Sequence, residues 1–417
     1  MSAVLVWFIA AAMIAGVLFR PKGWPEAVWA GAGAVLLVLF GLISPFDAFR
    51  AVRKGIDVYL FLTGMMILAE LARWEGVFDW LATLAVQKSR GSAARLFALV
   101  YTIGTAVTVF LSNDATAVVL TPAVYAAVKK CRAKPLPYLF ICAFVANAAS
   151  FVLPISNPAN LVVYGNQLPA LVPWVRLFAV PSVLAIGVTY IVIRWLWRGD
   201  LRQPIQEDDT ADLALSGPGR KALFGICCTG AVLMAASGMG WDLGLPTCLA
   251  AVVVVLIATR GEARALAQIA RHVSWTVLPL VAGLFVLVDA LNGAGALQMV
   301  GGLLQRTAEL WPPAGCLAAS FGIAGLSNVM NNLPSGLLSG GALQHARVPD
   351  YIRHAVLIGV DVGPNLSVSG SLATILWLIA LRREGEHVTA WEFLKAGALV
   401  MPPALLVSSL ALVAFAT

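Results

Sequence analysis

Long apolar segments follow one another along nearly the whole chain. Most have about the length of a membrane helix, roughly 17–25 residues, and they lack the alternation of membrane strands. The pattern predicts an all-α polytopic membrane protein. The expected spans are residues 2–19, 26–44, 56–86, 137–167, 177–197, 222–238, 243–258, 274–303, 351–380 and 395–416.

Two further regions are less regular, at residues 96–128 and 312–345, and polar residues interrupt each near its middle. Lysines and arginines flank the first region on both sides, which favours the same, cytoplasmic side for both ends. We therefore expect a re-entrant hairpin with its polar tip at residues 112–114, and a second hairpin at 312–345. A single kinked helix is the alternative for the first region.

The chain also carries one pattern twice. Glycine, acid and glycine recur six residues apart at Gly64, Glu70 and Gly76, and again at Gly283, Asp289 and Gly295. Residues 146–160 align with 360–374 without gaps, with similar placement of Ser, Asn, Pro and Gly. Matching sites in two halves are typical of duplicated transporters. We expect repeats at 1–198 and 222–417, joined by a linker at 199–221 that contains an acidic run (Glu207, Asp208, Asp209 and Asp212).

Basic residues predict the orientation. Placing most of them inside puts the N-terminus outside and the linker in the cytoplasm, in the inner (cytoplasmic) membrane. Arg50, Arg53 and Lys54 fall outside and disagree with the rule. About five crossings in each half, an odd number, make the repeats inverted. The expected fold has two inverted-topology repeats of about five transmembrane helices, each with a re-entrant hairpin and a broken helix.

Composition and charge support the same class. Of 417 residues, 60% are hydrophobic and 12% charged, against about 25% charged in soluble domains. Residues 2–19 lack the basic start of a signal peptide and precede many similar spans, so they are expected to be the first membrane helix. The net charge of +7 fits basic cytoplasmic loops, and no nucleic-acid partner is expected.

The candidate chemistry lies at the helix breaks. Ser112, Asn113 and Asp114 precede a helix restart, where free N–H groups can hold a solute, although capping alone would also explain them. Asn331 and Asn332 repeat this design. The stretches 154–160 and 363–374 are expected to be unwound and to line a shared cavity, the alternative being tolerated kinks.

Four acids lie in apolar surroundings: Glu70, Asp114, Asp289 and Asp361. An ionisable residue at that depth is a functional candidate, and we expect these acids to carry protons. For Glu70 and Asp289, packing through hydrogen bonds is the alternative. The four histidines (His272, His345, His354 and His387) are expected to lie at the surface, and the six cysteines to be fillers without metal-ligand spacing.

Four segments resemble the arsenite and antimonite efflux permeases of the ion transporter superfamily. They are FLSNDATAVVLTP (110–122), NAASFVLPISNPANLVVYG (147–165), GLSNVMNNLPSGLL (325–338) and GVDVGPNLSVSGSLATILWL (359–378). The resemblance implies export of trivalent arsenic or antimony hydroxide in exchange for protons, sometimes with a soluble arsenite-stimulated ATPase as partner. It implies a substrate site formed by Asn113, Asp114, Ser156, Asn157, Asn160, Asn331, Asn332, Ser369, Ser371 and Thr374.

The acid at the first tip favours a neutral substrate or a proton. Sodium-coupled carboxylate transporters of this superfamily carry Ser-Asn-Thr where this chain has Ser112, Asn113 and Asp114. Uncharged arsenous acid fits such a site, which is expected to be lined by oxygens and amides without a cysteine ligand.

Other readings remain open. A sodium/proton antiporter or an anion symporter could use the same scaffold, and a passive channel is a third possibility. An intramembrane enzyme is not expected: the run around Asp361 lacks a tyrosine-aspartate partner, and no His-Glu-x-x-His or phosphate-loop motif occurs. No cofactor is implied.

Overall fold

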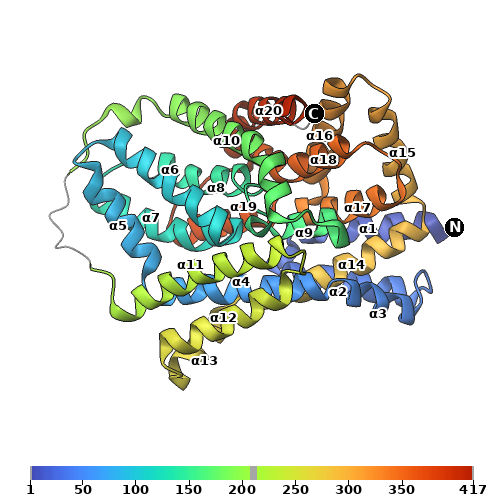
Figure 1. Ribbon diagram of the computed structural model, residues 1–417, viewed down its shortest axis with the longest axis horizontal. Coiled ribbons are helices and arrows are strands. Elements are labelled where there is room, and N and C mark those ends of the chain that lie inside the picture. Colours follow the sequence, from blue (N-terminus) through green and yellow to red (C-terminus); the bar gives the residue numbers. More distant parts are fainter. Residues whose placement is uncertain (1, 207–213, 416–417) are drawn as a thin grey trace.

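The computed structural model describes residues 2–206 and 214–415, and these fold into α-helices without a β-strand among them (Figure 1). The acidic run of the linker lies at residues 207–212, outside the described residues. The helices of the first half are α1 (Ser2–Phe19), α2 (Glu26–Leu39), α3 (Pro45–Lys54), α4 (Ile56–Trp74), α5 (Val77–Ser89), α6 (Ala93–Phe110), α7 (Thr121–Lys130), α8 (Leu136–Ala148), α9 (Pro158–Tyr164) and α10 (Leu171–Leu196).

The second half has the same order of elements. Several equivalent helices match in length: α3 and α13 have 10 residues, α5 and α15 have 13, and α10 and α20 have 26. Its helices are α11 (Gly217–Gly238), α12 (Gly244–Thr259), α13 (Ala263–His272), α14 (Val277–Gly293), α15 (Ala296–Ala308), α16 (Pro312–Met330), α17 (Asn332–His345), α18 (Asp350–Val362), α19 (Leu372–Arg383) and α20 (Ala390–Phe415).

The helices form two layers, with the longest axis of the molecule horizontal in Figure 1. A scaffold layer contains α1–α4 and α11–α14, and a core layer contains α6–α10 and α16–α20, with α5 and α15 joining them at opposite ends. We call the end that carries the linker the linker end, and the end that carries Ser2 and α15 the far end.

The repeated glycines have structural roles. A side chain at Gly64 of α4 would lie 2.7 Å from the backbone of Thr247 in α12, and one at Gly283 of α14 would lie 2.7 Å from the backbone of Ala30 in α2. At both crossings a helix of one half packs on a helix of the other. Glycine permits this close approach, as small residues do at membrane helix contacts.

The second glycine of each pattern ends a helix. Gly76 and Gly295 adopt left-handed backbone angles, with φ of +70° and +87°, and α5 and α15 start directly after them. The expectation of single spans at 56–86 and 274–303 was therefore wrong: each region contains two helices joined by a turn that glycine adopts without strain. The expected span 26–44 is also shorter, since α2 ends at Leu39 and α3 follows.

Both irregular regions fold as pairs of helices around a break. In the first, Ser92 pairs with Pro204 and the N–H of Gln206 donates to the carbonyl of Cys131 at 3.1 Å, so both ends lie beside the linker. Thr108 and Thr116 hydroxyls lie 2.8 Å apart across the reversal. In the second, Gly315 packs on the backbone of Thr307, and Gly301 lies against Ala346. The start of α16 and the end of α17 therefore both lie beside α15.

The close crossing at Gly283 gives a first prediction. Gly283→Ala should lower the free energy of unfolding by about 1–3 kcal/mol, because its Cβ overlaps the α2 backbone. Thermal unfolding of the purified protein measures this. Gly293→Ala, in the same helix with no heavy atom within 4 Å of the added Cβ, is the control. Equal melting temperatures for the two variants would contradict this packing.

Candidate functional site

The two unwound segments lie between α8 and α9 and between α18 and α19. The side chain of Asn157 starts α9 by accepting a hydrogen bond from the N–H of Ala159 at 3.0 Å. Ser371 starts α19 in the same way, accepting from the N–H of Thr374 at 3.1 Å, with the two hydroxyls 2.8 Å apart. These caps satisfy backbone groups that the helix breaks leave free.

Side-chain amides join the two unwound segments to each other. The amide of Asn157 donates to the carboxylate of Asp361 on α18. The amide of Asn147, on α8, donates to Asn365 at 3.0 Å and to Thr374 at 3.3 Å. The gapless alignment of residues 146–160 with 360–374 places Asn147 opposite Asp361. Equivalent positions in the two halves therefore each bond to the unwound segment of the other half.

The first hairpin tip is held by its own residues and by the first unwound segment. Ser112 accepts from the N–H of Ala115 at 3.1 Å, and the side-chain oxygen of Asn113 accepts from the N–H of Asp114 at 3.0 Å. The Ser156 hydroxyl donates to the carbonyl of Val109, next to the tip, at 3.0 Å. Ser112 and Asn113 are buried, whereas Asp114 is half-buried.

The second tip is bound to the second unwound segment. Asn331 has a positive φ of 78°, and its amide donates to the carbonyl of Ser369 at 3.4 Å. Asn328 donates to the carbonyl of Gly363 at 2.8 Å and accepts from the Ser367 hydroxyl at 2.6 Å. Asn331 and Asn332 are both buried.

Asn160 holds the first break together. Its amide donates to the carbonyls of Ser150, Leu153 and Pro154 at 2.9–3.3 Å. Several other buried polar atoms of the hairpins and unwound segments have no partner among the described residues, and such atoms call for a water or a ligand. They are Oδ1 of Asn147 and Asn160, Oδ2 of Asp361, and the hydroxyls of Ser327 and Ser335.

A cavity of about 690 Å³ runs from the linker end to the first tip. Ser112, Asp114 and Pro158 line it, together with the charged residues Arg73 and Arg383. Asp114 is therefore reachable from the linker end.

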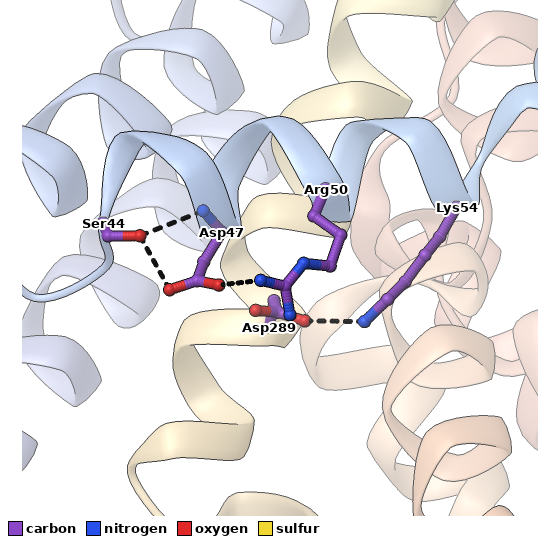
Figure 2. A network of polar contacts seen from close by, with 5 residues as sticks. All are labelled: Ser44, Asp47, Arg50, Lys54 and Asp289. Carbon is purple, nitrogen blue, oxygen red and sulfur yellow. Dashed lines mark hydrogen bonds and ion pairs between the residues drawn. The ribbon is translucent and has the colours of Figure 1, made fainter.

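The four acids differ in whether a cation is bound to them: Glu70 and Asp289 have a cation partner, and Asp114 and Asp361 have none among the described residues. Glu70 bonds to the guanidinium of Arg73, with Nε–O distances of 2.9 and 3.0 Å. Asp289 pairs with Lys54 at 3.0 Å, and Figure 2 shows this lysine reaching from α3 to α14. Within the described residues neither Asp114 nor Asp361 has a cation within ion-pair distance. Asp361 is completely buried and receives an amide donor instead.

Figure 2 also shows two of the three basic residues that disagreed with the positive-inside rule, Arg50 and Lys54. Arg50 forms an ion pair with Asp47 at 3.0 Å within α3, and Lys54 forms one with Asp289 of α14. These two charges are neutralised locally by acids.

All six cysteines lie outside both tips and both unwound segments in the sequence. Cys142 and Cys316 are buried in α8 and α16, where their thiols donate to the carbonyls of Tyr138 and Ser409. Cys227 and Cys228 are exposed on α11. Among the described residues, no group of three or more His, Cys, Asp or Glu side chains could hold a metal ion.

His354 corrects one expectation. Its side chain is 7% exposed rather than at the surface, and its Nδ1 lies 2.6 Å from the Tyr164 hydroxyl. The position near a predicted helix end suggested exposure, but α18 is covered on several sides by α16, α17 and α20.

Sequence reasoning missed Asn147 and Asn328 as members of the site. Asn147 could have been found from the same alignment, in which it stands opposite Asp361. Asn328 belongs to the polar run that ends at Asn331 and Asn332, one helical turn before the tip.

The comparisons with known proteins decide the class. The CitMHS family, described as "Citrate transporter", matches residues 5–360. The chain belongs to this transporter family. It is similar over 95% of both chains to the arsenical pump membrane protein of Escherichia coli, at 27% identity. It is also 26% identical to an uncharacterized transporter of Mycobacterium tuberculosis, over 88% of both chains.

A solved structure supports the fold. The Alcanivorax borkumensis YdaH transporter, whose topology is described as unusual, aligns with a TM-score of 0.54 at 13% identity, covering 88% of this chain and 86% of that one. At this identity the likeness concerns the fold alone. The chain is thus a multi-pass membrane transporter and not an enzyme.

The cross-half contact of Asn147 gives a second prediction. Asn147→Ala should destabilise the protein by about 1–3 kcal/mol, because Asn365 and Thr374 lose a buried donor. Asn292→Ala, a half-buried asparagine in α14, is the control. The melting temperature measures both, and a loss for Asn147→Ala no larger than for the control would refute the contact's structural role.

Proposed function

We propose that this transporter exports trivalent arsenic or antimony as the neutral hydroxide, in exchange for protons. The single observation that carries the proposal is the chemistry of the four breaks, which combine amides, hydroxyls and two carboxylates. None of residues 104–121, 147–160, 324–335 and 361–374 is a lysine, arginine or histidine. Within these four segments a multiply charged anion such as citrate would meet carboxylates and no cation, because the arginines of the linker-end cavity lie outside the breaks, on α4 and at the end of α19.

Arsenous acid suits such a lining because it is uncharged at neutral pH and presents hydroxyl groups. Amides, hydroxyls and backbone carbonyls can bind it by hydrogen bonds. The proposed substrate site comprises Asn113, Ser156, Asn157, Asn160, Asn331, Asn332, Ser369, Ser371 and Thr374. The names of the E. coli relatives support the choice of solute.

Proton exchange rests on the acids. Asp114 lines the linker-end cavity and Asp361 is buried beside Asn157, both without a cation partner among the described residues. Glu70 and Asp289 remain candidates, with Arg73 and Lys54 as their partners. One proton moving inward supplies about 2.3 kcal/mol per 100 mV of membrane potential, enough for more than a tenfold solute gradient.

The proposed orientation follows the basic residues, with the linker end in the cytoplasm and the N-terminus outside, in the inner membrane. The two halves would then be inverted repeats whose hairpins enter from opposite sides. The linker end would also be the side available to a soluble arsenite-stimulated ATPase, should such a partner assist export.

A second candidate is an anion symporter, favoured by the description of the matching family as a citrate transporter. It predicts sodium-dependent or proton-dependent citrate movement in the same direction as the coupling ion. A sodium/proton antiporter would move neither arsenite nor citrate. One vesicle preparation distinguishes these three activities.

Everted membrane vesicles provide the main test. With an imposed proton gradient, acid inside, the native protein should accumulate arsenite, and Asp114→Asn should reduce the accumulation by about tenfold or more because the coupling energy is lost. Asp47→Asn, on the surface of α3, should behave as the native protein. Sodium-driven citrate uptake without arsenite uptake would overturn the proposal.

The cysteines provide an independent test of the binding chemistry. A variant with all six cysteines replaced by serine or alanine should retain arsenite uptake within about twofold of the native rate, because oxygen and amide groups bind the hydroxide. Size-exclusion chromatography checks that the variant folds. Complete loss of uptake by a folded variant would indicate thiolate ligation.

A further inference from the structure

Two polar contacts join α9 to α18, which run side by side in opposite directions. Asn157 contacts Asp361, and Tyr164 contacts His354 beside a cavity at the far end. The partners on each helix are seven residues apart, which corresponds to about 10 Å along an α-helix. His354 and Asp361 therefore lie on the same face of α18, two turns apart.

His354 borders a second cavity, of about 680 Å³, at the far end. Tyr164, Asp350, Tyr351 and Arg353 also line it. The imidazole is shielded from the rest of the core by aromatic rings: Phe178 of α10 meets it edge-on at 5.6 Å, and Trp174 packs on Tyr164 at 5.5 Å. The ring thus borders a far-end cavity while remaining within the protein.

The duplication provides an internal comparison. Helices α8 and α18 are both 13 residues long, and residues 136–148 correspond to 350–362. On this alignment Phe140 stands where the second half has His354, and Leu378 corresponds to Tyr164. Phe140 packs against Phe144 and Trp377. At the equivalent place toward the linker end, α19 is joined to α8 by the Trp377 indole, which donates to the carbonyl of Leu139 at 2.9 Å. Neither Phe140 nor Leu378 can titrate there, whereas the far end has a tyrosine–histidine contact.

We propose that His354, held by Tyr164, is a proton-binding residue of the transport cycle that is loaded from the far-end cavity. The inference rests on the proton exchange proposed above and assigns one end of that exchange to a residue. Histidine is the side chain whose unperturbed charge change lies nearest to neutral pH. In the proposed orientation, the far end is the side from which protons enter.

The surroundings define how the group would respond. Neutral His354 can accept the Tyr164 hydroxyl proton at Nδ1, whereas the imidazolium donates from Nδ1 and the hydroxyl must accept. When the neutral ring carries its proton on Nε2, uptake of a second proton at Nδ1 therefore reverses this hydrogen bond between α9 and α18. The other charged neighbours are Asp350 and Arg353 of the same helix, the latter bonded to Gln167. Phe178 and Trp174 of α10 do not titrate.

The experiment varies the pH of the vesicle lumen, which contacts the far end in everted vesicles. Native uptake of arsenite should change several-fold between about pH 4 and 7.5, a range that covers buried as well as exposed histidines, and His354→Gln should reduce that change to less than about twofold. His345→Gln, an exposed histidine at the end of α17, should keep the native profile. Arsenite counterflow, which needs no net proton movement, shows that each variant is folded and binds solute.

The possible results distinguish the role of His354 from the proton coupling of the proposed function. A native lumenal pH profile in His354→Gln would overturn the inference while leaving proton exchange intact. A native protein without any lumenal pH response would overturn both the inference and the proton coupling of the proposed function. If His354→Gln fails in counterflow, Tyr164→Phe replaces it: removal of the hydroxyl should shift the midpoint of the lumenal pH profile, and an unchanged midpoint would refute the role of this pair.

Discussion

The hydrogen bonding of broken helices inside a membrane protein is the constraint on which the other features depend. A helix that unwinds away from water exposes N–H and C=O groups that must find partners within the protein. Here asparagine and serine side chains provide them: Asn160 binds three carbonyls, Ser156 binds Val109, and Asn328 binds Gly363. The polar side chains of the candidate site thus first stabilise the breaks, and their unused atoms remain for a solute.

The breaks of the two halves, whose helices follow the same order, meet through cross-half contacts. Glycines at 64 and 283 let each half pack a scaffold helix closely against the other half. In the core layer, Asn147 and Asp361 each reach the opposite unwound segment. The two halves differ at two of these positions. An amide stands opposite an acid at positions 147 and 361, and Phe140 stands opposite His354.

Much of this arrangement could be predicted from sequence, because hydrophobic length, polar interruptions and repeated spacing are local signals. They indicated an all-helical transporter, both hairpin regions and both unwound segments. Other features depend on contacts between distant residues. The turns at Gly76 and Gly295 divided spans that looked continuous, and the partners of Glu70 and Asp289 could not be chosen from several nearby cations. His354 looked exposed because its burial depends on how α16, α17 and α20 pack around it.

The most direct measurement of the central claim is the position of a bound metalloid. Trivalent antimony scatters X-rays anomalously, so a crystal soaked with antimonite would locate it without assumptions about the site. The account predicts a single strong peak among the oxygens and amides of the two tips and the two unwound segments, with no sulfur in its coordination. A peak at a cysteine, or at the surface away from both hairpins, would contradict it.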